Sequence, residues 1–81
     1  MPKKINNLKS YNKITKWLVN KGYLRVEEVQ EKGDFSVRGN IIDVYPYKME
    51  EPLRFEYDDD NLETIRIYSL KTLRSKTIFK K

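Results

Sequence analysis

The chain has 81 residues, a net charge of +5, 38% hydrophobic residues and 36% charged residues. It contains no Cys and no His, which excludes a disulfide framework, thiolate metal sites and the commonest general base. No apolar run approaches the roughly 20 residues of a membrane span. We therefore expect one domain over residues 1–81, monomeric and cytoplasmic, with no membrane contact and with ten aromatic residues (six Tyr, three Phe, one Trp) available for a core.

Charge is unevenly distributed along the chain. All 12 Asp and Glu lie between residues 23 and 63, whereas the 17 Lys and Arg are enriched at the two ends. Basic ends are compatible with nucleic-acid binding. They are also typical of a solvated surface that keeps a small domain in solution, and composition favours this second interpretation.

The first predicted element is a helix near the N-terminus. Apolar residues recur there at spacings of three and four and form one helix face: Leu8, Tyr11, Ile14, Trp17 and Leu18. Ser10 is a candidate N-cap, and Gly22 suits the left-handed conformation that ends a helix.

Residues 23–29 are predicted to form the first strand, with Leu24 and Val26 facing inward. A hairpin over residues 33–46 follows, because alternating apolar residues flank Gly39-Asn40, a dipeptide that permits a tight turn. Alternation places Phe35 and Val37 on one face of this hairpin and Ser36 and Arg38 on the other.

Alternating residues predict further strands at 53–57 and 62–68, and a short edge strand at 76–79. Residues 58–61 and 69–73 are predicted turns. The expected fold class is α+β: one N-terminal helix packed on a twisted, mainly antiparallel sheet of five to six strands.

Catalytic motifs are missing from the sequence. There is no phosphate-binding Gly-x-x-x-x-Gly-Lys-Ser/Thr loop and no Ser-His or Cys-His pair. The acidic run at residues 58–60 lacks the spacing of a calcium loop and is typical of a turn. We therefore predict no catalytic residue, no metal site and no cofactor.

The remaining candidate is a polar sheet face. Arg25, Ser36, Arg38, Arg54 and Glu56 all alternate with residues predicted to face inward. Because Arg is enriched at binding hot spots and grips carboxylates with two hydrogen bonds, this face is a candidate protein-docking surface. The alternative is a solvated face whose cross-strand ion pairs each contribute only tenths of a kcal/mol to the stability of the fold.

The order and spacing of these motifs resemble the UvrB-homology module. The matching segments are residues 22–29, 33–46, 52–59, 65–66 and 72–75, so the resemblance covers most of the chain from about Lys13 to Ser75. That module occurs in the excinuclease subunit UvrB and in the bacterial transcription-repair coupling factor, Mfd. The small residue at Ser36 and the Thr-Leu-Arg-Ser of residues 72–75 are more similar to the coupling-factor form.

The resemblance implies a UvrA-binding domain that recruits nucleotide excision repair to a stalled RNA polymerase. It carries the UvrA-facing residues over onto Arg25, Arg38, Arg54 and Glu56. It also implies masking by the C-terminal domain of the parent coupling factor, whose other parts supply an ATP-driven translocase. Ser36 departs from the Arg found in UvrB, which removes one charge-assisted contact.

The sequence is compatible with two alternatives. One is a degenerate module with weak or no UvrA binding, which is consistent with Ser36 in place of the Arg found in UvrB. The other is a small basic nucleic-acid binder, which needs aromatic residues on an exposed sheet face. The alternation instead predicts that Phe35, Phe55 and Tyr57 face inward, so direct DNA binding is not favoured, and no direct contact with RNA polymerase is expected.

Overall fold

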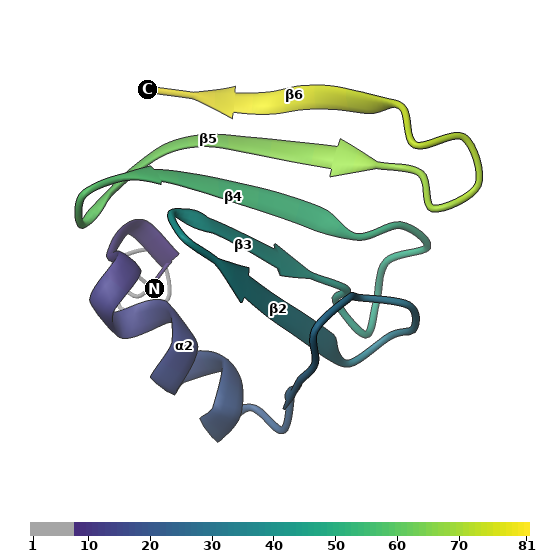
Figure 1. Cartoon of the computed structure of the whole chain (residues 1–81), viewed down its shortest axis with the longest axis horizontal. Coiled ribbons are helices and arrows are strands. Elements are labelled where there is room, and N and C mark those ends of the chain that lie inside the picture. The colour runs from purple at the N-terminus through teal and green to yellow at the C-terminus, as the bar shows by residue number, and fades with distance from the viewer. Residues whose placement is uncertain (1–7) are drawn as a thin grey trace.

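The computed structural model describes residues 8–81 and has one helix and a six-stranded sheet. Helix α2 (Tyr11–Asn20) precedes strands that follow one another in both sequence and space (Figure 1). The strands are β1 (Leu24–Arg25), β2 (Asp34–Arg38), β3 (Ile41–Val44), β4 (Leu53–Asp58), β5 (Asn61–Tyr68) and β6 (Ser75–Lys80). The predicted α+β class is confirmed, and no helix of the described part is long and apolar enough to cross a membrane.

Helix α2 begins after Ser10 and ends before Gly22, whose φ of 91° is left-handed as predicted. Ser10 occupies the N-cap position as predicted, but its side chain makes no capping bond to the helix. The carboxylate of Asp60, in the turn after β4, instead accepts bonds from the Asn12 N–H and the Ser10 hydroxyl, both at 2.8 Å. The bond from Asn12, and then that from Ser10, lowers the pKa of Asp60.

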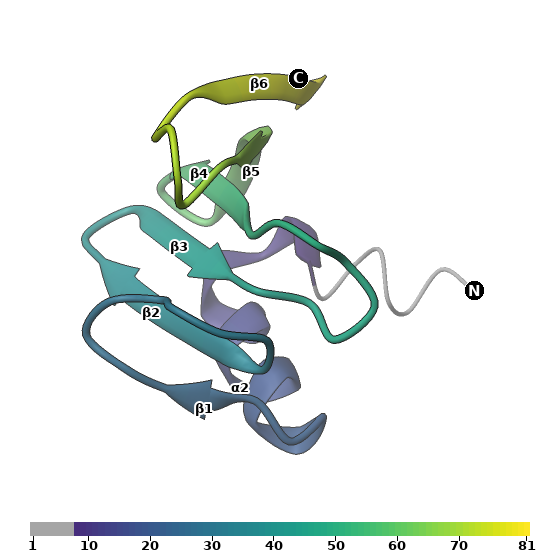
Figure 2. The same ribbon diagram turned by 90° about the vertical axis from the view of Figure 1, so that its right-hand side faces the viewer.

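The first strand differs from the sequence prediction. Only Leu24–Arg25 is extended, and it pairs with β2 in parallel, not antiparallel (Figure 2). The chain then loops back because the Asp34 carboxylate accepts the N–H groups of Gln30 and Glu31, each at 3.1 Å. Leu24, which we expected to face inward, is 66% exposed.

Strands β2 to β6 form an antiparallel meander whose buried face meets the helix. The hairpin turns at Gly39, with a φ of 58°, as predicted. A register shift opposite Glu56 and Tyr57 lets Leu62 and Ile65, three residues apart, both face inward. The resulting core consists of Ile14, Leu18, Phe35, Ile42, Val44, Phe55, Tyr57 and Leu62.

The helix covers only one end of the sheet. Figure 1 shows α2 below β2 and β3, while β6 lies farthest from it. All six residues of β6 are exposed, as expected for an edge strand, and its Lys residues are the kind of charge that discourages edge-to-edge pairing. The sheet face opposite the helix is not covered by any described helix, and this face holds the candidate site.

Candidate functional site

The open face of the sheet carries a row of polar side chains that the strand register brings together. Asp43 on β3 lies between Ser36 on β2 and Arg54 on β4. Arg54 is in turn opposite Arg66 on β5, and Glu56 is opposite Thr64. Since cross-strand partners share a face, these side chains all lie on the open face, which also holds Ile41 between Arg38 and Glu56.

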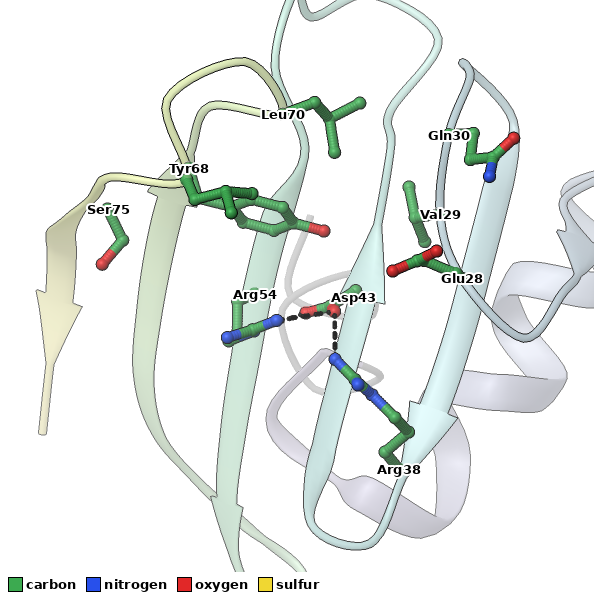
Figure 3. A pocket seen from close by; sticks show the side chains of 10 residues that line it. Glu28, Val29, Gln30, Arg38, Asp43, Arg54, Tyr68, Leu70 and Ser75 are labelled. Atoms are coloured by element: carbon green, nitrogen blue, oxygen red, sulfur yellow. Dashed lines mark hydrogen bonds and ion pairs between the residues drawn. The ribbon is translucent and has the colours of Figure 1, made fainter.

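Asp43 is the centre of this surface and is only 4% exposed. Its carboxylate accepts two hydrogen bonds from Arg54, from Nε at 2.8 Å and from Nη2 at 3.0 Å. Arg38 approaches the same carboxylate from the other side, with Nη2 at 3.6 Å (Figure 3). Two arginines, from the strands on either side of β3, thus converge on one buried acid.

Arg54 is held on a second side by an aromatic ring. Its guanidinium carbon lies 5.1 Å from the ring centroid of Tyr68, within the range of a cation–π contact. The hydrogen bonds to Asp43 raise the pKa of Arg54. Burial, followed by the negative charge of Asp43, raises the pKa of Tyr68 to about 12. Both groups therefore keep their neutral-pH charge states across the physiological range.

Glu56 forms a second polar cluster farther along β4. It accepts a hydrogen bond from the Thr64 hydroxyl and another from Arg66 Nε at 3.1 Å. The Thr64 bond, and after it the Arg66 bond, lowers the pKa of Glu56. The Glu56 side chain is one-third exposed, so a partner can reach it.

An open pocket of about 520 Å³ lies over the two arginines. Its floor is polar, and its rim comes from the loop after β1 and the turn before β6. On that rim Leu70 is 39% exposed and Leu73 is 78% exposed. The lining residues are Glu28, Val29, Gln30, Arg38, Asp43, Arg54, Tyr68, Leu70, Leu73 and Ser75. A charged floor with an exposed apolar rim fits a protein side chain better than it fits chemistry on a small substrate.

The structure brings three of the four predicted site residues together on the open face: Arg38, Arg54 and Glu56. Arg25 lies apart, because β1 pairs in parallel and places it beside Phe35, on the side of the helix. There it lines a smaller hollow of about 350 Å³, with Lys16 and Asn20 among its neighbours. Among residues 8–81 no group of three or more acidic or other metal-ligating side chains lies together.

Sequence reasoning missed Asp43 and Tyr68 as members of this site. A signal for Asp43 was present, since it is the single charged residue within the apolar stretch at residues 41–45. A charged residue in a buried strand needs a partner of opposite charge, and the Arg residues predicted on the polar face of the sheet were the candidates. Tyr68 carried no such signal, because its contact with Arg54 depends on the register of β4 and β5.

Comparison with known proteins gives a consistent result. A family model described as the UvrB interaction domain matches residues 4–81. The transcription-repair-coupling factor of Staphylococcus aureus (strain USA300) is 46% identical over 59 residues, which is 73% of this chain. That of Bacillus subtilis (strain 168) is 43% identical over 58 residues, or 72% of this chain. The chain spans about 5% of the length of these curated relatives.

Proposed function

This chain belongs to the UvrB interaction domain family, and from that premise we propose that it is a protein-docking module that binds UvrA. The open face, with Arg38, Arg54 and Glu56, is the proposed contact surface. Arg25 is included as an outlying contact at the β1 edge. The module has no catalytic role of its own, and in a transcription-repair coupling factor its binding would bring excision repair to a stalled RNA polymerase.

The observation that carries this proposal is Arg54, fixed by Asp43 and Tyr68, with Arg38 and an apolar rim beside it. Binding orders flexible side chains at a cost of about 0.5–1.5 kcal/mol each. Arg54 is already held by Asp43 and Tyr68, so much of this cost is met before the partner arrives. Arg and Tyr are the residue types enriched at binding hot spots, and the exposed side chains of Leu70 and Leu73 offer apolar area beside them.

We place the module in the cytoplasm as a monomeric unit, with UvrA as its partner and with the C-terminal domain of the parent protein as a competing intramolecular partner. DNA and RNA polymerase are not proposed as direct partners of this face. Translocation along DNA would belong to other parts of a coupling factor.

Charge reversal at the two arginines tests the proposed face. Arg38→Glu and Arg54→Glu should each abolish UvrA binding in calorimetric titrations, because each replaces a donor with a repelling carboxylate. Arg25→Glu should weaken binding less, since its side chain lies on the helix side. Lys13→Glu, an equal charge change on the exposed surface of α2, is the matched control and should bind as the original chain does.

Circular dichroism separates a lost contact from a lost fold in these variants. The proposal requires that the Arg38 variant keep its native spectrum, because that side chain is 65% exposed. Normal UvrA binding by folded Arg38→Glu and Arg54→Glu would rule out the open face as the contact surface.

A further inference from the structure

Burying the carboxylate of Asp43 carries a desolvation penalty, although the residue lies at the centre of the proposed binding face. We propose that Asp43 is the positioning residue of the UvrA-binding face: it fixes Arg54 in place and leaves Arg38 as the movable donor. This inference rests on the proposed function and adds to it a residue that acts through Arg54.

Burial sets Asp43 apart from the other ion pairs of the described chain. Lys32 and Glu50 also pair, at 3.1 Å, but their side chains are 41% and 89% exposed. Such a surface pair contributes little, whereas a buried carboxylate is costly unless hydrogen-bonded and paired. The Asp43 side chain is only 5% exposed, so its arginine contacts are what make its burial tolerable.

Arg54 is constrained in both position and orientation. Its two bonds to Asp43 use Nε and Nη2, and the two nitrogens fix the plane of the guanidinium. The guanidinium carbon also lies over the ring of Tyr68. Nη1 takes no part in these bonds, and the Arg54 side chain is 33% exposed, so we infer that Nη1 is the donor that Arg54 offers to a partner.

Arg38 is held far more loosely by the same carboxylate. Its 3.6 Å contact is beyond hydrogen-bond length, and its side chain is 65% exposed, compared with 33% for Arg54. Turning Arg38 outward therefore breaks no hydrogen bond. Because Arg54 alone satisfies both carboxylate oxygens, Asp43 stays paired when Arg38 moves (Figure 3).

A double-mutant cycle tests this division of roles, with UvrA affinity and thermal stability measured for every variant. Asp43→Asn should weaken UvrA binding roughly tenfold by releasing Arg54, and Arg54→Gln should weaken it by at least as much. Asp43→Asn/Arg54→Gln should bind no more weakly than Arg54→Gln. In an Arg38→Gln background, Asp43→Asn should keep its full effect, because Asp43 acts through Arg54.

The positioning role would be overturned if the affinity losses of the two single variants multiplied in the Asp43→Asn/Arg54→Gln double variant. It would also be overturned if Asp43→Asn alone left the affinity for UvrA unchanged. If Asp43→Asn does not fold, Asp43→Glu takes its place. It keeps the charge but moves the carboxylate by one methylene, and should weaken binding only when Arg54 is present. Failure of the unmodified chain to bind UvrA would reject the proposed function itself, a result distinct from either of these.

Discussion

The charged residues of the open face are held by partners on neighbouring strands, and this decides what each can do. Arg54 is fixed by Asp43 and Tyr68, whereas Glu56 is fixed by Thr64 and Arg66. Exposed ion pairs of ordinary geometry would be worth little. Here the bonds fix the orientation of the donors and acceptors on the open face before any partner is present.

Glu56 gives the face a dependence on pH. Its pKa lies below the ordinary 4.5, chiefly because of the Thr64 bond, so the folded chain takes up its proton less readily than the unfolded chain. Its stabilising contribution is therefore present above the unfolded pKa and is lost as pH falls through the folded value.

Denaturant titrations of the original chain and Glu56→Gln check this expectation. The stability advantage of the original chain should shrink as pH falls from about 5 to about 3. Glu27→Gln, an exposed acid in the loop after β1, is the control. An advantage that stayed constant over this range would show that the bonds of Glu56 are not those of an ionised carboxylate.

Of the three glycines, Gly33 is the one at which an added side chain meets the closest contact. Its φ is 93°, and a Cβ there would lie 2.9 Å from Cε1 of Tyr47. Gly33→Ala should lower the free energy of unfolding by about 1–3 kcal/mol, through backbone strain and the clash.

Gly39→Ala is the natural comparison in the same denaturation experiment. Its φ is 58°, but nothing lies within 4 Å of the added Cβ. It should cost less than Gly33→Ala, about 1–2 kcal/mol from the left-handed backbone alone. Equal losses would mean that the Tyr47 ring moves aside freely.

At the scale of elements, the N-terminus of α2 depends on a turn 48 residues away in sequence. Asp60 accepts the Asn12 N–H at 2.8 Å and the Ser10 hydroxyl, and its backbone carbonyl accepts the Tyr11 N–H at 3.0 Å. A negative charge at a helix N-terminus is favourable, and these bonds also tie the helix to the β4–β5 hairpin.

Asp60→Ala should therefore lower the thermal unfolding midpoint and reduce helical signal in circular dichroism. Asp58→Ala, a neighbouring exposed acid in the same hairpin, should leave both unchanged. If both variants lost the same stability, the effect would come from removing a negative charge from the turn and not from losing the bonds of Asp60 to the helix.

The elements that sequence reasoning predicted well are those defined by local pattern. Alternation located the hairpin and strands β4 and β5, and helical spacing located Ile14 and Leu18. The first strand was predicted too long because the turn-back at Asp34 uses side chain to backbone bonds, and its parallel pairing with β2 was not predicted. Local pattern also could not predict the face of Arg25, which depends on the pairing of β1 with β2. Nor could it predict that Asp60 binds the N-terminus of a helix 48 residues away.

At the scale of the whole molecule, the helix and the open face lie on opposite sides of the sheet. The core between helix and sheet buries Phe35, Phe55 and Tyr57, as predicted. Because they are buried, these rings cannot stack with bases. A protein that binds single-stranded nucleic acid through a sheet needs such rings on its exposed face. The arrangement favours a scaffold that presents one polar face to a protein.

The most direct test of this account is a calorimetric titration of the chain against purified UvrA at moderate salt, with single-stranded and duplex DNA titrated in parallel. The account predicts saturable binding to UvrA and little binding to either DNA. No binding to UvrA, together with DNA binding that weakens steeply as salt is raised, would contradict it and indicate a nucleic-acid-binding domain.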